Sequence, residues 1–132
     1  MELEEQVPNK TGFSWRDLNG KDRWESFSPT FGALTVVGAT TYYGRLRIVG
    51  RMCYFQVQFS AVTSIESTAG THYLTLPVTA NTQSLAGIAT MTNDTTNIAV
   101  GNCHIDVATS RCYLPTQVAS ANVFTLAGSY EV

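Results

Sequence analysis

Residues 45–62 read RLRIVGRMCYFQVQFSAV, and this stretch decides the fold. Gly50-Arg51 separates two runs of alternating residues, and a glycine at the first central position of a two-residue connection is typical of a type II′ hairpin turn. Beyond the turn, apolar side chains (Cys53, Phe55, Val57, Phe59) alternate with more polar ones (Tyr54, Gln56, Gln58, Ser60). This period of two predicts an antiparallel hairpin with one buried face and one polar face.

Short alternating runs bounded by Gly, Asn and Pro continue along the rest of the chain. No stretch repeats its apolar residues at the helical period of 3.6 over three turns. A chain of 132 residues is long enough for one two-layer core but not for two. We therefore predict an all-β protein, an antiparallel β-sandwich or jelly roll of about eight short strands with little helix. The expected strands cover residues 33–37, 45–49 (with 40–43 leading into it), 52–62, 72–76, 85–91, 98–100, 103–107, 111–114 and 122–127, with polar loops at 63–71 and 92–97.

The N-terminal part differs from the sheet part in composition. Residues 1–12 are polar, contain Pro8 and Gly12 and show no periodicity, so we expect a linker or attachment segment. Residues 13–32 interleave aromatic residues with charges, which predicts a strap that packs on the sheets by its rings. The β-sandwich domain is expected to span residues 13–132, with this strap as its first part.

Charge is distributed unevenly. Ten of the eighteen charged residues lie in the first 25 positions, and the remaining 107 positions hold only eight. A soluble monomer normally carries about a quarter of its residues as charges. The low charge of the sheet part therefore favours either a surface partly covered by other copies of the chain or a robust particle component that faces the outside. The net charge of −2 argues against nucleic acid as a partner, since phosphate binding needs clustered Lys and Arg.

The sequence contains no run of 18 apolar residues, and its N-terminus is acidic, so neither membrane insertion nor a signal peptide is expected. The three cysteines are Cys53, Cys103 and Cys112, an odd number without a close pair. Free and mostly buried thiols are the favoured interpretation, and a disulfide between Cys103 and Cys112 across a hairpin is the alternative.

The sequence contains little that points to catalytic chemistry. His104 and Asp106 share one strand face with Asn102, but no nucleophile motif accompanies them. Cys103 and His104 are adjacent in a strand and point to opposite faces, which argues against a zinc site. We therefore expect no catalytic residues, no metal and no cofactor.

Neutral groups with stacking planes are abundant instead. The stacking planes belong to five tyrosines and one histidine (Tyr42, Tyr43, Tyr54, Tyr73, Tyr113, His72), and many Ser, Thr and Asn side chains supply neutral hydrogen-bonding groups. Such groups suit a carbohydrate, which presents hydroxyls and apolar C–H faces. They equally suit a subunit interface, where tyrosine is enriched and charge is depleted, and the sequence leaves both interpretations open.

An ordered set of segments resembles the β-sandwich domain near the C-termini of phage and prophage tail fibres and related virion receptor-binding proteins. The segments are FSPT at 27–30, YGRLRIVG at 43–50, the strand at 52–60, YLTLP at 73–77, YLP at 113–115 and FTLAGSY at 124–130. The resemblance covers residues 24–132. It implies a homotrimer that is assembled in the bacterial cytoplasm, joins other virion tail or head proteins, and attaches to a glycan or protein at the outer cell surface.

Three functions follow as hypotheses. The leading one is a non-enzymatic virion adhesion module that binds a host receptor, with glycan preferred, in loops or between subunits. The second is a structural capsid or tail decoration protein whose partners are other virion proteins. The third is a glycan-active enzyme that uses His104 and Asp106. The receptor-binding residues expected in the two polar loops are Ser64, Glu66, Ser67, Asn93, Asp94 and Thr95.

Overall fold

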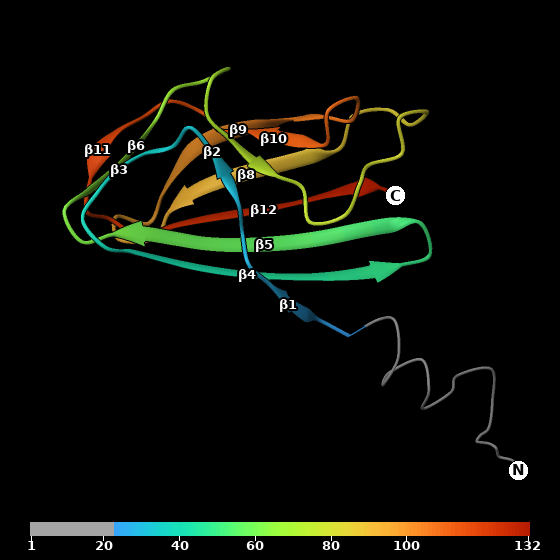
Figure 1. Ribbon diagram of the computed structural model, residues 1–132, viewed down its shortest axis with the longest axis horizontal. Coiled ribbons are helices and arrows are strands. Elements are labelled where there is room, and N and C mark those ends of the chain that lie inside the picture. Colours follow the sequence, from blue (N-terminus) through green and yellow to red (C-terminus); the bar gives the residue numbers. More distant parts are fainter. Residues whose placement is uncertain (1–22) are drawn as a thin grey trace, which may run out of the picture.

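A computed structural model of the chain describes residues 23–132, which form twelve β-strands and no helix (Figure 1). All strand pairs are antiparallel, and the predicted all-β, sandwich-like fold is confirmed. The strands are β1 (Glu25–Phe27), β2 (Phe31–Gly32), β3 (Thr35–Val37), β4 (Thr40–Val49), β5 (Met52–Ala61), β6 (Ser64–Ser67), β7 (Tyr73–Thr75), β8 (Ile88–Asn93), β9 (Ile98–Asp106), β10 (Arg111–Tyr113), β11 (Gln117–Ser120) and β12 (Phe124–Glu131).

Nine strands form one sheet in the order β1-β4-β5-β12-β8-β9-β10-β7-β2, and a small sheet has the order β11-β6-β3. The large sheet curls into a half-barrel, and the segment that leads from β1 to β2 crosses in front of β4 and β5 (Figure 1). The ring centroid of Phe31 on β2 lies 5.1 Å from that of Tyr42 and 5.0 Å from that of Phe59. These ring contacts join the two ends of the sheet across the core, which gives the sandwich-like packing.

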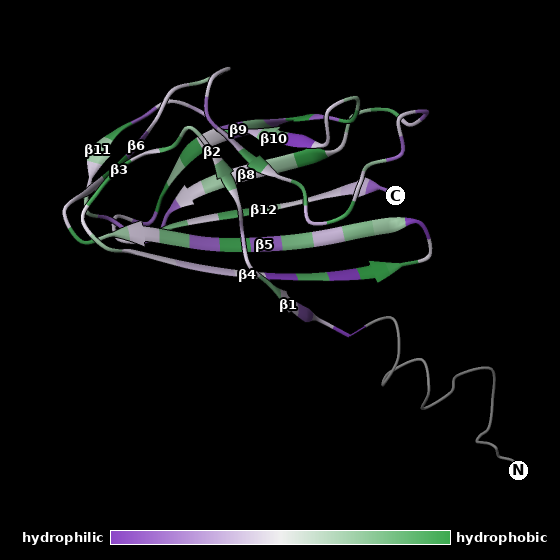
Figure 2. Ribbon diagram, viewed as in Figure 1, coloured by the Kyte–Doolittle hydropathy of each residue, from purple (hydrophilic) through white to green (hydrophobic). Residues whose placement is uncertain are grey.

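The β4–β5 hairpin forms as the sequence predicts. Val49 pairs with Met52 across the two-residue turn Gly50-Arg51. The φ of Gly50 is +61°, whereas the φ of Arg51 is not positive. A positive φ at the first central residue only is the pattern of a type II′ turn. Side chains of β5 alternate between the core and the outer face, and the bands of hydropathy along β5 in Figure 2 follow this alternation.

The core lies between the inner faces of the curled sheet. β12 is an interior strand of the sheet, pairing with β5 on one side and β8 on the other. Phe124 of β12 stacks on Phe59 at 5.6 Å, and Tyr130 meets Phe55 edge-on at 5.8 Å. Burial of these large side chains stabilises the fold by about 1.5–3 kcal/mol for each of them.

Three parts of the strand prediction are wrong. β6 lies inside the predicted loop 63–71, where the single apolar residue Ile65 gave too little alternation to detect. Thr92 and Asn93 belong to β8 and not to the loop 92–97. The two strands expected at 98–100 and 103–107 are one strand, β9, in which a register shift opposite Met91 and Thr92 leaves Val100 as the extra residue of a bulge.

The sequence also gave no strand signal for β1, β2 and β11, which are two to four residues long. Within the predicted strap, Phe27 and Phe31 pack against the core, and Trp24 lies at the surface. The predicted linker 1–12 and the strap up to residue 22 lie outside the described residues.

Candidate functional site

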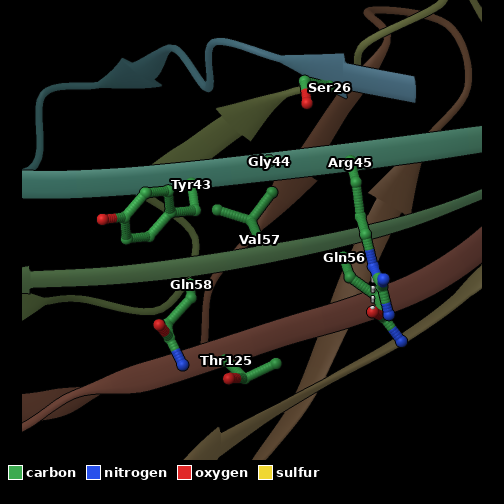
Figure 3. A pocket seen from close by; sticks show the side chains of 8 residues that line it. All are labelled: Ser26, Tyr43, Gly44, Arg45, Gln56, Val57, Gln58 and Thr125. Carbon is green, nitrogen blue, oxygen red and sulfur yellow. Dashed lines mark hydrogen bonds between the residues drawn. The ribbon is translucent and has the colours of Figure 1, made fainter. Parts of the chain in front are cut away.

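The outward face of β4, β5 and β12 carries an open groove with a volume of about 410 Å³ (Figure 3). The hairpin register places Arg45 opposite Gln56 and Tyr43 opposite Gln58, and β12 adds Thr125 opposite Gln58. All five side chains leave the same face of the sheet because residues two apart on a strand point the same way. The remaining lining residues are Ser26, Gly44 and Val57.

Tyr43 supplies an aromatic platform at this groove. Its side chain is 66% exposed, whereas most aromatic rings of the described chain contribute to the core or to ring clusters. In Figure 3 the Tyr43 ring lies beside the polar side chain of Gln58 and extends away from the strand. A ring held on a rigid strand loses little conformational entropy when a ligand stacks on it.

Arg45 is held in place from two sides. Its Nε donates a hydrogen bond of 2.8 Å to Oε1 of Gln56, the dashed line in Figure 3, and its guanidinium carbon lies 4.4 Å from the ring centroid of Trp24. Arg47, two residues along the same face, lies 5.7 Å from Trp24 and 5.9 Å from the Tyr54 ring. A second hollow of about 280 Å³, lined by Trp24, Arg47, Tyr54 and Gln56, adjoins the first through Gln56.

Asp94 lies at the opposite side of the groove. Its Oδ2 accepts hydrogen bonds from the Thr125 hydroxyl and, at 3.5 Å, from the Gln58 amide nitrogen. This face therefore carries cationic groups at Arg45 in the groove and at Arg47 in the adjoining hollow, neutral amide and hydroxyl groups in the centre of the groove, and one carboxylate beside Gln58 and Thr125.

Of the receptor-binding residues predicted in the loop 92–97, only Asp94 touches the groove. Asn93 is buried, and its Oδ1 accepts hydrogen bonds from the backbone N–H groups of Thr95 and Thr96. The Thr95 hydroxyl accepts a hydrogen bond of 3.0 Å from the Val123 N–H. Asn93 and Thr95 therefore shape the turn that presents Asp94.

The other three predicted residues belong to β6 in the small sheet. Ser67 is buried, and its hydroxyl donates a hydrogen bond of 2.6 Å to the Pro115 carbonyl, so it ties β6 to the segment before β11. Ser64 is half-buried and pairs with Val37, while Glu66 is exposed and pairs with Thr35. The structure does not bring these three residues into contact with the groove residues.

The structure assigns the tyrosines and His72 named above to different places in the fold. Tyr42 packs on Phe31 at the core, and the buried His72 accepts a hydrogen bond of 2.9 Å at Nδ1 from the Thr68 N–H. Tyr73 and Tyr113 form an edge-on pair at 5.5 Å on the outward side of β7 and β10. Tyr43 and Tyr54 are thus the tyrosines that remain exposed on the grooved face.

His104 and Asp106 do face outward on β9, beside a third hollow of about 390 Å³ that His104 helps to line. The His104 ring stacks with Tyr113 at 6.4 Å. The Asp106 carboxylate accepts hydrogen bonds from the Thr109 hydroxyl and the Ala108 N–H, and these bonds lower its pKa below the ordinary value of 3.8. The carboxylate is thus used to close the turn 106–109.

The three cysteines are free thiols, and Cys53 and Cys112 are buried. Burial raises the pKa of Cys53. A hydrogen bond with Cys103, followed by burial, raises the pKa of Cys112. Because the thiolate is the reactive form, both residues are expected to be inert in the folded protein.

In residues 23–132, no three His, Cys, Asp or Glu side chains gather in a way that could hold a metal ion, and no helix has the length and apolar character needed to cross a membrane. Comparisons of the chain with protein families, with curated proteins and with solved structures find no match. The groove therefore has to be interpreted from its own chemistry.

Proposed function

We propose that this chain is a non-enzymatic adhesion module of a phage virion, a tail-fibre tip or a similar component, that binds a host-cell surface glycan as a homotrimer. The resemblance of residues 24–132 to tail-fibre domains and the sandwich-like all-β fold support the class. The groove formed by Tyr43, Arg45, Gln56, Gln58 and Thr125 is the proposed glycan site, in place of the predicted loops.

The observation that carries this proposal is the combination of one exposed ring with planar hydrogen-bonding groups on a rigid sheet. A sugar ring presents an apolar C–H face that stacks on an aromatic ring such as Tyr43. Its vicinal hydroxyls pair with the amides of Gln58 and Gln56, which offer donors and acceptors side by side, and with Arg45, which offers donors. An open groove suits a surface polysaccharide, because both ends of the bound segment must continue outward.

A glycan array with the labelled full-length chain tests this function. We expect binding to one class of bacterial surface oligosaccharide and at least about 10-fold weaker binding by Tyr43→Ala, a loss of roughly 1.4 kcal/mol. Gln83→Ala is the control, since Gln83 is exposed, does not line the groove and is not one of the exposed apolar residues. An array without any binding, or equal binding by Tyr43→Ala and the wild type, would contradict the proposal.

The homotrimer is supported by apolar side chains on the surface. Largely exposed apolar residues are Val62, Leu85, Ile88, Ile98 and Val118. Closed cyclic assembly covers such side chains and leaves no unpaired apolar interface open to further association. The edge strands β1, β2, β3 and β11 are all short, so assembly by extending a sheet edge is disfavoured.

The same exposed apolar side chains favour a second candidate function, a structural decoration protein whose partners are other virion proteins. This candidate requires tight binding to purified capsid or tail together with the absence of glycan binding. Substituting Val118→Ser and Val62→Ser would then weaken capsid or tail binding, whereas Tyr43→Ala would leave it unchanged.

A further inference from the structure

We infer that the groove, together with the adjoining hollow, recognises an acidic glycan, whose anionic group (a carboxylate or a phosphate on the sugar) is held by Arg45 and Arg47. This inference rests on the proposed glycan-binding function and names the substrate class of that site. The neutral part of the same oligosaccharide would lie over Tyr43 and Gln58.

The two arginines are positioned as a pair. They are two residues apart on β4, so both side chains leave the outward face, and both guanidinium groups lie over the ring of Trp24. Stacking of a guanidinium on an aromatic ring restricts its motion and leaves its edge open for hydrogen bonds. Trp24 thus keeps two cationic groups together that would otherwise repel one another.

The contacts of Arg45 also define which of its donors serve a ligand. A guanidinium has five N–H donors, and Gln56 takes the one on Nε. The N–H groups on the two terminal nitrogens form the planar fork that matches a carboxylate or phosphate in a bidentate manner. In Figure 3 these terminal nitrogens extend past Gln56 and away from β4.

The surrounding charges favour an external anion. Among residues 23–132, no carboxylate forms an ion pair with Arg45 or Arg47. The Asp94 carboxylate accepts hydrogen bonds from Gln58 and Thr125 and not from the arginines. Glu131 lies opposite Met52 in the β5–β12 register, two residues along β5 from Tyr54. An anionic sugar would therefore be oriented, with its charge at the arginines and its neutral part near Asp94.

The test compares an acidic oligosaccharide with its own neutral form. Isothermal titration uses an oligouronate, the same oligomer after reduction of its carboxyl groups to alcohols, and a phosphorylated oligosaccharide of similar length. We expect at least one acidic probe to bind about 10-fold more tightly than the reduced one, with a preference that weakens as salt rises. The double variant Arg45→Gln/Arg47→Gln should lose this preference.

Arg111→Gln is the matched control, since Arg111 also lies over a ring, 4.1 Å from the Tyr73 centroid, but lines neither the groove nor the adjoining hollow. It should retain the preference. If the double variant is unfolded by circular dichroism, Arg45→Lys replaces it and should reduce the preference while keeping the charge. A preference that survives these groove substitutions, or is lost in Arg111→Gln, overturns the assignment.

The outcomes separate this inference from the function on which it rests. Equal binding of acidic and reduced probes, abolished by Tyr43→Ala, overturns the acidic-glycan inference and leaves the glycan-binding proposal standing. If no acidic or neutral oligosaccharide binds, both proposals fail.

Discussion

Tyr130 shows how one buried polar group stabilises this fold. Its hydroxyl donates a hydrogen bond of 2.7 Å to the Val78 carbonyl and accepts one of 3.0 Å from the Val78 N–H. Burial raises the pKa of Tyr130, so the hydroxyl stays protonated and keeps its donor. Through these two bonds the segment after β7 is tied to β12, 52 residues further along the chain.

Tyr130→Phe should therefore lower the free energy of unfolding by about 1–3 kcal/mol, because both backbone groups of Val78 lose their hydrogen-bond partner at a partly buried position. Urea denaturation followed by fluorescence measures this loss. Tyr43→Phe is the control at an exposed site and should change stability by less than about 0.5 kcal/mol. Equal stability of Tyr130→Phe and the wild type would show that the hydroxyl is dispensable.

Asp106 gives a prediction on pH. The Thr109 hydroxyl, and then the backbone N–H groups of Ala108 and Thr109, stabilise the charged carboxylate and lower its pKa below 3.8. Because the folded pKa is lowered, this contribution to stability is complete above pH 3.8 and is lost as pH falls through the folded pKa. Carbon NMR of the carboxyl group should give a midpoint below 3.8, and Thr109→Val should raise it. A midpoint at or above 3.8 in the wild type would contradict these contacts.

At the scale of elements, β8 and β12 approach each other closely because of glycine. A Cβ on Gly128 would lie 2.5 Å from the Ile88 carbonyl oxygen and 2.6 Å from the Ala89 Cβ. A Cβ on Gly87 would meet the Ser129 carbonyl at 2.2 Å. Two glycines on facing segments thus allow the backbones to pack without side chains between them.

Gly128→Ala should destabilise the protein by about 1–3 kcal/mol, because backbone atoms of β8 must move to admit the methyl group. Thermal unfolding of this variant, compared with the outward-facing Ser129→Ala, provides the measurement. If the two variants melt at the same temperature, the close approach of β8 and β12 is not a constraint on stability.

The elements differ in how well the sequence predicts them. The β4–β5 hairpin was predictable in full, because a two-residue turn fixes its register and thereby places Arg45 opposite Gln56 and Tyr43 opposite Gln58. The neighbour of Gln58 on the other side, Thr125, was not predictable, because pairing of β5 with β12 joins segments far apart in sequence. β6 was missed because Ser67 is buried through a hydrogen bond with Pro115 and not through apolar character.

At the scale of the whole molecule, the low charge of the sequence and the exposed apolar side chains of the structure describe the same uncharged surface. Residues 26–132 contain only eight charged side chains, and Leu85, Ile88, Val62 and Val118 are largely open to solvent. The structure leaves these apolar groups on its surface instead of covering them with polar ones. Contact between copies of the chain would remove them from water.

Light scattering coupled to size exclusion should therefore give a mass three times the 14.4 kDa of one chain at micromolar concentration. Val62→Glu and Val118→Glu should shift the mass towards one chain, because charges are costly in an apolar interface. Glu66→Gln is the control, because Glu66 is also on the small sheet and this substitution adds no charge and hardly changes the size of the side chain. A wild-type mass of 14.4 kDa throughout the dilution series would contradict the trimer.

The position of the bound oligosaccharide on the protein distinguishes the groove from the loops predicted at 63–71 and 92–97. Two-dimensional NMR of the labelled chain, titrated with the oligosaccharide that binds best on the array, reports which backbone amides sense the ligand. We expect the largest shifts at Tyr43, Arg45, Gln56 and Gln58, with the same midpoint as the titration by calorimetry. Shifts centred on Ser64, Glu66 and Ser67 with the groove amides unmoved would contradict this expectation.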